Sequence, residues 1–420
     1  MRLFIATPTH YLQGGVERIL ESLATHLPAH GLEVIFGLAK GARFHDPERF
    51  RAAFPVIRGV DVDGTSGTAY GRRRALRRAI LAADPDVVLI ARMFDAYPVC
   101  AALKSQRHRL RLAVTIQAYE DDYFYDLARW QEFVDVCVTS GERIASTVRM
   151  LTGVPAVSIP GGVAPARRFR EPHDGPLRIG YVGRVVQVQK RVLDLPLLAR
   201  ELERRGVPFT CAVAGDGTAL AELRTQWPQA RSLGWLSTAE LYERVYPELD
   251  VLVHFAEWEG MTIAPREAMA HGVVPVVSRF VGAEDFVEEV NSLTFPVGDV
   301  NAAADAIERL HRDRALLERL SAHARVSQTG IRSELGAIEA WSSALRDALS
   351  RPARVGASLP VAPRDHGLLT RAGVPDALAE LVRRVRNRAH GDAGSEWPHW
   401  SGLRDDEVAH VLRNAGVHAG

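Results

Sequence analysis

The chain has 420 residues, of which 47% are hydrophobic and 25% charged, a composition typical of soluble globular proteins. This length exceeds what one ordinary hydrophobic core needs, so we expect two domains. The formal net charge of +1 argues against nucleic-acid binding through a basic surface, and no apolar run is long enough to span a bilayer.

The first part of the chain alternates short apolar runs with amphipathic stretches. The apolar runs predict strands at residues 2–7, 33–39, 86–91, 111–116, 135–140 and 156–160. The amphipathic stretches predict helices that include residues 16–29, 70–83 and 120–133. Strands that are apolar along their whole length are buried on both faces, which is typical of a parallel sheet covered by helices. Residues 1–160 are therefore predicted to form a doubly wound α/β domain.

A second α/β domain is expected further along the chain. Residues 161–176 are rich in Pro, Gly and Arg and are interpreted as a linker. The second domain is predicted over 177–329, from strands at residues 177–183, 209–215, 230–236, 250–256, 273–278 and 293–297. Residues 330–350 predict a helix that could cross back to the first domain, and residues 351–420 form a tail without an assigned role. A cleft between the two domains is the default ligand site.

Cysteine and lysine are both scarce. The cysteines lie in apolar runs without metal-ligand spacing and are interpreted as buried thiols of a cytoplasmic protein: Cys100, Cys137 and Cys211. Of the 52 basic residues only three are lysines: Lys40, Lys104 and Lys190. A lysine inside a candidate motif is therefore informative.

Two cations follow the first strand of the second domain, in "IGYVGRVVQVQKR". The strand ends at Gly183, and Arg184 and Lys190 lie in a turn that is expected to open a helix. Such cations suit a diphosphate, because the N–H groups and the dipole of a helix N-terminus add to their field. The alternative is a solvated Arg/Lys pair at the end of a strand.

Two glutamates, Glu259 and Glu267, follow the strand at 250–256 in "EWEGMTIAPREAMAHG". A helix is expected to begin near Thr262, and its free N–H groups would face the same phosphate. Glu267 could then accept two hydroxyl hydrogen bonds from a ribose, and Glu259 could reach sugar hydroxyls beyond the phosphate. The alternative is a pair of surface glutamates.

These motifs together resemble the family-4 glycosyltransferases of the GT-B fold. The family carries a Glu-x7-Glu motif that "EGMTIAPREAMAHG" matches, and "GRVVQVQK", the "VAGDG" turn, "LGWL", "NSLTFPVGD" and the N-terminal "GGVER" loop occur in the family's order. The resemblance covers roughly residues 1–350. It implies an α/β protein with two Rossmann-like, doubly wound domains that face each other across a cleft.

The resemblance also implies a reaction. Such enzymes move a hexose-type sugar, with retention at the anomeric carbon, from a nucleotide diphosphate sugar to a glycan, a lipid-linked acceptor or a small molecule. Arg184 and Lys190 would stabilise the leaving nucleotide in place of a metal ion, so neither a metal nor a cofactor is expected. Glu259 would hold the donor sugar at its 3- and 4-hydroxyls, and Glu267 would bind the ribose.

Further donor contacts follow from the same resemblance. Gly14 and Gly15 would let the loop of the first domain approach the donor phosphate. Trp235 and Leu236 would border the base. The other implied donor-binding residues are Gln117, Gly183, Gly215, Gly260, Met261, Thr262 and Ile263.

Two positions depart from the family's pattern. The family often has a histidine where Gln117 stands, and glutamine can bind a sugar hydroxyl but cannot carry a proton at neutral pH. Thr262 narrows the loop near the donor sugar. The acidic, aromatic run Tyr119–Tyr125 has two interpretations, an acceptor site or the start of a surface helix.

A basic cluster lies in "GRRRALRRAI", residues 71–80. The arginines between Arg72 and Arg78 could contact an anionic membrane, as basic helices of the first domain often do in this family. The alternative is a solvated arginine face. The expected location is the cytoplasm, with the inner face of the membrane as the place of any peripheral contact.

Two functions remain open at this level. The first is an active retaining glycosyltransferase. The second is a protein of the same fold that binds a nucleotide sugar with weak or no transfer and acts as a partner or scaffold. A nicotinamide dehydrogenase is excluded, because no G-x-G-x-x-G follows the first strand.

Overall fold

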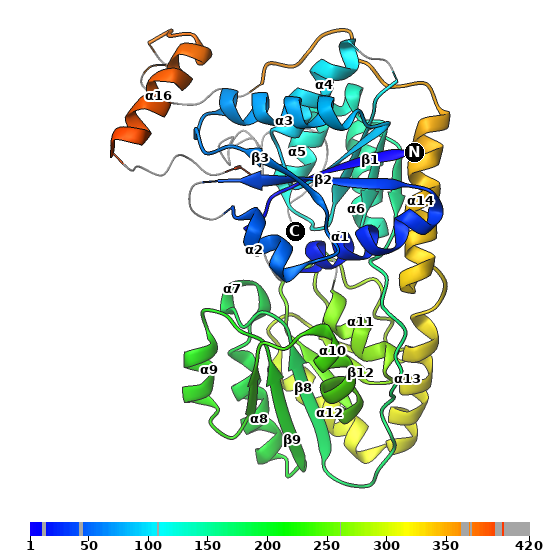
Figure 1. Cartoon of the computed structure of the whole chain (residues 1–420). Coiled ribbons are helices and arrows are strands. Elements are labelled where there is room, and N and C mark those ends of the chain that lie inside the picture. The colour runs from blue at the N-terminus through cyan, green and yellow to red at the C-terminus, as the bar shows by residue number, and fades with distance from the viewer. Residues whose placement is uncertain are drawn as a thin grey trace. The chain divides into compact units, whose positions relative to one another are not determined.

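The computed structural model describes residues 1–10, 14–41, 45–106, 109–260, 262–362, 369, 372–390 and 397–398. The chain divides into two compact units, which are drawn in Figure 1. Unit 1 contains Met1–Ile159 and Ile338–Gly420, and unit 2 contains Pro160–Ala337. Met261, one of the predicted donor-binding residues, lies outside the described residues.

Unit 1 is built on a seven-stranded parallel sheet in the order β3-β2-β1-β4-β5-β6-β7. Its strands are β1 (Arg2–Thr7), β2 (Glu33–Lys40), β3 (Gly59–Asp63), β4 (Val87–Ala91), β5 (Arg111–Ile116), β6 (Val136–Thr139) and β7 (Ala156–Ser158). The central strands β1, β4 and β5 are buried almost throughout, as continuously apolar runs predict. The doubly wound α/β prediction is confirmed for this unit.

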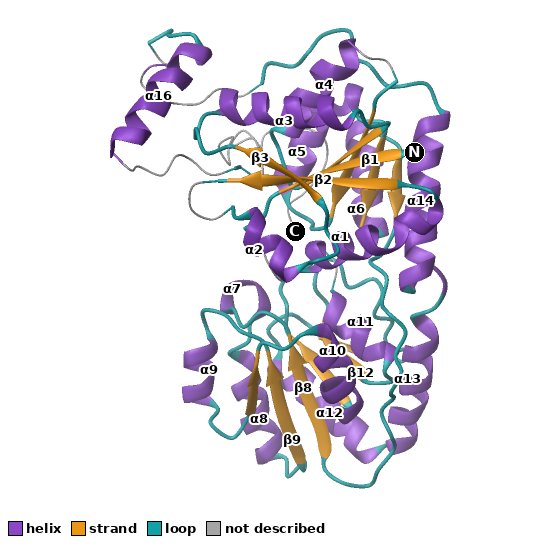
Figure 2. Ribbon diagram, viewed as in Figure 1, coloured by secondary structure: helices purple, strands orange, loops and turns teal. Residues whose placement is uncertain are grey.

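Helices cover the faces of this sheet (Figure 2). They are α1 (Gly15–His26), η1 (Leu27–His30), α2 (Pro47–Ala53), α3 (Ala69–Ala83), α4 (Ala96–Gln106), α5 (Asp121–Trp130), η2 (Gln131–Phe133) and α6 (Glu142–Thr152). The amphipathic stretches predicted around residues 16–29, 70–83 and 120–133 thus form helices with small shifts at their ends.

Unit 2 contains a six-stranded parallel sheet in the order β10-β9-β8-β11-β12-β13. Its strands are β8 (Leu177–Val182), β9 (Phe209–Ala214), β10 (Arg231–Gly234), β11 (Val251–His254), β12 (Val274–Ser278) and β13 (Leu293–Phe295). The chain moves outward from β8 to β10 and then returns to β11 on the other side of β8. This reversal is a topological switch point, where open α/β sheets bind ligands at the carboxyl ends of their strands.

The helical elements of unit 2 differ widely in length. They are α7 (Gln187–Lys190), α8 (Asp194–Arg204), α9 (Leu220–Gln226), α10 (Thr238–Glu240), η3 (Leu241–Val245), η4 (Tyr246–Glu248), α11 (Ile263–Ala270), α12 (Val300–Arg312), α13 (Arg314–Ser327) and η5 (Gly330–Arg332). The long helix after β8 is α8, which begins only at Asp194. Lys190 therefore ends the one-turn α7 and does not open the long helix, in contrast to the expectation.

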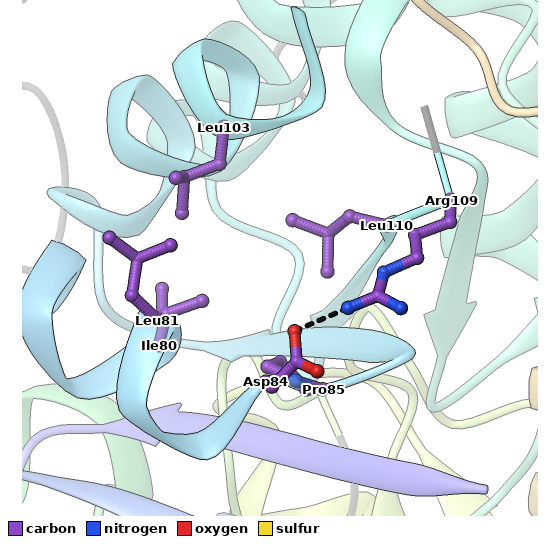
Figure 3. Close-up of a pocket in the computed structure, with 7 residues that line it drawn as sticks. All are labelled: Ile80, Leu81, Asp84, Pro85, Leu103, Arg109 and Leu110. Atoms are coloured by element: carbon purple, nitrogen blue, oxygen red, sulfur yellow. Dashed lines mark hydrogen bonds and ion pairs between the residues drawn. The ribbon is translucent and has the colours of Figure 1, made fainter. Parts of the chain in front are cut away.

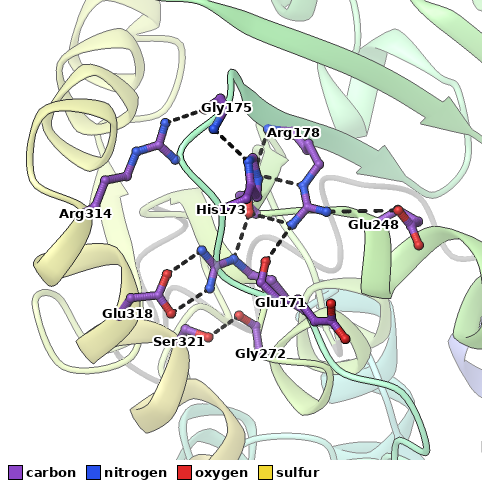
Figure 4. A network of polar contacts seen from close by, with 11 residues as sticks. Glu171, His173, Gly175, Arg178, Glu248, Gly272, Arg314, Glu318 and Ser321 are labelled. Carbon is purple, nitrogen blue, oxygen red and sulfur yellow. Dashed lines mark hydrogen bonds and ion pairs between the residues drawn. The ribbon is translucent and has the colours of Figure 1, made fainter.

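A buried ionic network fastens the segment before β8 to the amino end of β11 (Figure 4). Asp250 is fully buried and accepts hydrogen bonds from Arg170 Nε at 2.8 Å and from Arg178 Nη2 at 2.9 Å. His173 Nε2 lies 2.8 Å from the second oxygen of Asp250, and Arg170 also pairs with Glu318 at 2.6 Å. The network lies at the opposite end of β11 from the switch-point loops.

The helix α14 (Glu334–Ser350) begins in the last residues of unit 2 and continues into unit 1, and α16 (Asp376–His390) follows later. Arg111 of β5 donates to the carbonyl oxygens of Ala348 and Arg351, at 3.1 and 2.8 Å. The Trp397 indole donates to the Lys40 carbonyl oxygen at 3.0 Å. In the part of the chain that the structure describes, no helix is long and apolar enough to cross a membrane.

Candidate functional site

The candidate site lies in unit 2, where the turns after β8 and β11 meet. Lys190, at the end of α7, forms an ion pair with Glu259, in the loop after β11. The side chains of Lys190 and Glu259 are only 11% and 7% exposed, so the pair is shielded from water. The structure thus brings together two of the predicted catalytic residues, although 69 positions separate them in the chain.

Gln189 links Arg184 to the same loop. Arg184 Nη2 donates to Gln189 Oε1 at 2.6 Å, and Gln189 Nε2 donates to the Trp258 carbonyl oxygen at 3.1 Å. The backbone N–H of Glu257 in turn donates to the Gln189 carbonyl oxygen at 2.9 Å. Arg184 itself is exposed. The two turns are therefore fixed to each other while one guanidinium faces solvent.

Glu259 is held as a carboxylate. Burial raises its pKa, but the charge of Lys190 and the hydrogen bond from His254 outweigh this effect and lower the pKa to about 2. His254, the last residue of β11, has its Nε2 3.2 Å from Glu259 Oε1. Burial lowers the pKa of His254, against the effect of its bond to Glu259. At neutral pH the site therefore combines an ionised Glu259 with a neutral His254.

Glu267 is also positioned by a partner outside its own helix. It is 5% exposed in α11, and the hydroxyl of Tyr246, in η4, donates to its Oε2 at 2.7 Å. The ring of Tyr246 is fully buried. The carboxylate at the predicted ribose position is thus ordered before any ligand arrives.

Glycines allow the turns after β8 and β9 to touch. A Cβ on Gly215, whose φ is +145°, would lie 1.9 Å from the carbonyl oxygen of Gly183. The Gly183 N–H donates to Ala214 O at 3.0 Å. Only glycine fits at position 215, because any side chain would collide with the backbone beside it.

The predicted residues on the other borders of the site differ in exposure. Trp235 is 53% exposed, whereas Leu236 is partly buried against a small core cluster. Thr262 occupies the position before α11, which begins at Ile263, and its buried hydroxyl has no hydrogen-bond partner among the described residues. Gly260 precedes this helix start and is half-buried.

The other predicted donor contacts lie in unit 1. Gly14 caps α1 and Gly15 is its first residue. Glu17, in the first turn, is buried and forms an ion pair with Arg92, which follows β4 with a φ of +57°. Gln117 follows β5, is 9% exposed, and donates from Nε2 to the Thr115 hydroxyl.

Several of these positioning residues were missed by the sequence analysis. They are Glu17, Arg92, Gln189, Tyr246 and His254. The clearest missed signal is His254, an ionisable residue at the end of the otherwise apolar run "DVLVHFA". Such a group is rarely buried without a partner, which in this chain is Glu259.

The arginine cluster on α3 is smaller at the surface than its sequence predicts. Arg72 is buried, and its Nε lies 2.6 Å from Asp95; the Nε of Arg73 lies 2.8 Å from the other oxygen of Asp95. The exposed members are Arg74, Arg77 and Arg78. Two of the five arginines therefore pair with one fully buried carboxylate and add little to the exposed face of the helix. The membrane contact stays a prediction for the other three.

A small pocket lies apart from the candidate site. Figure 3 shows this pocket, which is in unit 1 and which none of the predicted donor-binding residues lines. Its lining residues are Ile80, Leu81, Asp84, Pro85, Leu103, Arg109 and Leu110. Among the described residues no group of three or more His, Cys, Asp or Glu side chains could hold a metal ion.

Comparison with known families adds to this geometry. The family model described as "Glycosyltransferase Family 4" matches residues 13–167, and the one described as "Glycosyl transferases group 1" matches residues 176–313. The two models together match more than half of the chain. The chain belongs to the family-4 glycosyltransferases. The predicted resemblance is thereby confirmed.

Other family-4 proteins and GT-B structures are similar to this chain over part or most of its length. A GDP-mannose-dependent alpha-mannosyltransferase of Corynebacterium glutamicum is 26% identical over 267 residues. The match covers 61% of this chain but only 57% of that relative.

Many solved structures match the fold. A sucrose-phosphate synthase from Thermosynechococcus elongatus has a TM-score of 0.70 at 14% identity and covers 83% of this chain and 99% of its own. The pneumococcal O-GlcNAc transferase GtfA, in complex with UDP and GlcNAc, has a TM-score of 0.69 at 13% identity, with coverages of 84% and 99%. The predicted GT-B fold is confirmed by these likenesses and by the two parallel sheets.

Proposed function

We propose that this glycosyltransferase moves a hexose-type sugar from a nucleoside diphosphate sugar to an acceptor, with retention at the anomeric carbon. The observation that carries the proposal is the shielded Lys190–Glu259 pair at the switch point of unit 2. A cation and a carboxylate in contact there can separate to bind a phosphate and a sugar hydroxyl. The related mannosyltransferase is described as GDP-mannose-dependent, and GtfA was solved with UDP and GlcNAc, so both bases are candidates.

The charges of the site suit a leaving nucleoside diphosphate. Negative charge develops on the distal phosphate as the bond to the sugar breaks, and fixed cations stabilise it most in a water-poor site. The side chain of Lys190 is only 11% exposed, and Arg184 is linked through Gln189 to the same loop. These two residues would supply the stabilisation that a divalent metal gives in other enzymes, so we propose a metal-independent reaction.

The carboxylates suit hydroxyl groups on the two sides of the diphosphate. Glu267, ordered by Tyr246, would bind the ribose, and Glu259 would bind the donor sugar. Retention would follow from attack on the same face of the sugar that the nucleotide leaves. No side chain then has to form a covalent intermediate, and catalysis depends on positioning and on leaving-group stabilisation.

The first test is a thermal-shift screen with GDP, GDP-mannose, UDP and UDP-GlcNAc. A ligand that binds only the folded state raises the melting temperature, by mass action. For the nucleotide sugar that binds, the release of nucleoside diphosphate is then measured. We expect Lys190→Ala to reduce its release about 10²–10³-fold, the size typical of losing one transition-state charge partner.

Lys40→Ala is the matched control, because Lys40 lies in unit 1 and its side chain is 47% exposed. Its turnover should equal that of the wild type. Lys190→Ala with undiminished release would contradict the proposal.

The alternative is a protein that binds the nucleotide sugar but transfers weakly. Gln117 favours it, because it cannot relay a proton, and its amide nitrogen already donates to Thr115. Saturable binding of a nucleotide sugar with no release of nucleotide, alone or with a panel of sugar acceptors, would support this alternative.

A further inference from the structure

His254 is a buried histidine that the proposed reaction does not yet use. It ends β11 and is 2% exposed. Its ring stacks on Tyr181, with centroids 6.5 Å apart and planes at 10°, and meets the ring of Phe280 edge-on at 5.8 Å. Two aromatic neighbours thus fix the imidazole, whose Nε2 faces Glu259 Oε1 at 3.2 Å.

The Glu259 carboxylate has two partners among the described residues, and both meet the same oxygen, Oε1. The partners differ in mobility and in charge. Lys190 is a long, flexible cation that a diphosphate would attract, whereas the ring of His254 is packed in place. When Lys190 turns toward a ligand, His254 is the partner that stays.

The position of His254 also defines its tautomer. Nε2 faces a carboxylate oxygen, so it must carry the proton. Nδ1 is buried and has no hydrogen-bond partner among the described residues. A second proton there would place an unpaired N–H and a buried positive charge close to Lys190, which is costly. His254 therefore acts as a neutral hydrogen-bond donor.

The same packing reaches the other side of the site. The hydroxyl of Tyr181, which stacks on His254, donates to the carbonyl oxygen of Arg184 at 2.6 Å. The stacked rings of Tyr181 and His254 thus contact two predicted binding residues. Tyr181 supports the backbone of Arg184, which is predicted to bind the phosphate, and His254 supports the carboxylate of Glu259, which is predicted to bind the sugar.

We propose that His254 is a positioning residue for the donor sugar, which holds the Glu259 carboxylate in place when Lys190 moves to the diphosphate. This role rests on the proposed function of the site. It predicts that His254 matters for a nucleotide sugar and hardly at all for the nucleoside diphosphate alone, because only the sugar needs Glu259.

Three substitutions separate the hydrogen bond from the packing. His254→Phe keeps a ring between Tyr181 and Phe280 but removes the donor. His254→Gln places an amide nitrogen near the position of Nε2, and the shorter His254→Asn places one near Nδ1. Binding of GDP, GDP-mannose, UDP and UDP-GlcNAc is measured by calorimetry for each variant, after thermal unfolding has shown that it folds.

The expected pattern is selective. His254→Phe and His254→Asn should weaken binding of the nucleotide sugar about tenfold and binding of the matching nucleoside diphosphate less than about twofold. His254→Gln should bind both ligands within about threefold of the wild-type affinity. Equal loss of both ligands in His254→Phe, or no loss of either, would overturn the role. A wild-type protein that binds none of the four compounds refutes the proposed function itself, and the role with it.

A ligand-free measurement examines the hydrogen bond directly. Nitrogen-15 NMR of histidine-labelled protein, with His254 assigned from the His254→Gln spectrum, should show a neutral Nε2–H tautomer from pH 6 to 8 whose signal moves in Glu259→Gln. A cationic ring or an Nδ1–H tautomer would overturn the inference whatever the protein binds.

Discussion

At the scale of single residues, the ionised Glu259 stabilises the folded state and is also the carboxylate that the proposed reaction uses. Its pKa is about 2 in the folded chain, against an ordinary value of 4.5, so the folded state binds this proton less readily than the unfolded state. The resulting stabilisation is complete above pH 4.5 and is lost as the pH falls toward 2. Glu259 therefore contributes to stability at neutral pH and not in acid.

Glu259→Gln should lower the melting temperature at pH 7, by an amount that corresponds to about 1–3 kcal/mol, because Lys190 loses its charged partner. The difference from the wild type should shrink as the pH falls from 4.5 toward 2, since the wild-type carboxylate is then protonated as well. Differential scanning calorimetry at pH 7, 4 and 3 measures it. A difference that does not vary with pH would show that the charge is not what stabilises this site.

Individual residues of the site could be predicted only where they belong to a motif. Lys190 and Glu259 were selected from their spacing and their neighbours, and the structure joins them. Tyr246 and His254 were not predicted, because their roles come from packing. Tyr246 lies in a one-turn 3-10 helix and reaches Glu267, 21 positions away, and His254 at the end of β11 contacts Glu259 in the following loop. The sequence marks His254 as an ionisable residue in an apolar run, but it does not name the partner of either residue.

At the scale of elements, the turns after β8 and β9 need glycine because their backbones touch. Gly215→Ala would force a Cβ to within 1.9 Å of the Gly183 carbonyl oxygen, at a φ of +145°. We expect a loss of about 3 kcal/mol or more, since neither backbone can move without disturbing the sheet beside it. Because Gly183 leads into Arg184, binding of the nucleotide sugar should weaken too.

The matched control is Gly206→Ala, which has a φ of +69° and no heavy atom within 4 Å of the added Cβ. It should cost only about 1 kcal/mol, the strain of a left-handed backbone. Thermal unfolding compares the two variants. Equal shifts in melting temperature would mean that backbone conformation alone, and not the contact, makes position 215 a glycine.

Most elements were predictable from apolar runs in the sequence. All six predicted strands of unit 2 formed: β8, β11 and β12 are buried almost throughout, whereas the edge strand β10 has no fully buried residue. In unit 1 the strand β3 was missed: its sequence "GVDVD" is short and half polar, and Val60 is 45% exposed at the edge of the sheet. This strand buries too little apolar surface to leave a clear pattern in the sequence.

At the scale of the whole molecule, the network around Asp250 attaches the segment before β8 to the rest of unit 2. Asp250→Asn should lower the stability of unit 2 by about 3–5 kcal/mol, because it leaves Arg170 buried without one of its two carboxylates. Trypsin should then cut more rapidly in residues 160–176, which contain three arginines. Melting temperature and the rate of this cleavage measure the effect.

Glu248→Gln is the control, since this carboxylate is 59% exposed and lies 4.0 Å from Arg178. An exposed ion pair of this kind contributes less than about 1 kcal/mol to stability, so neither the melting temperature nor the cleavage rate should change appreciably. Comparable cleavage in both variants would indicate that the buried network does not hold the segment.

The scarcity of lysine has a practical consequence. The side chains of Lys40, Lys104 and Lys190 are 47%, 0% and 11% exposed, so an amine-acylating reagent should modify them at well-separated rates. Mass spectrometry of the peptides can follow all three in one experiment, with Lys40 as the fast internal reference. A nucleotide sugar that engages Lys190 should slow acylation there alone, which would turn an accident of amino-acid usage into a footprint of the occupied site.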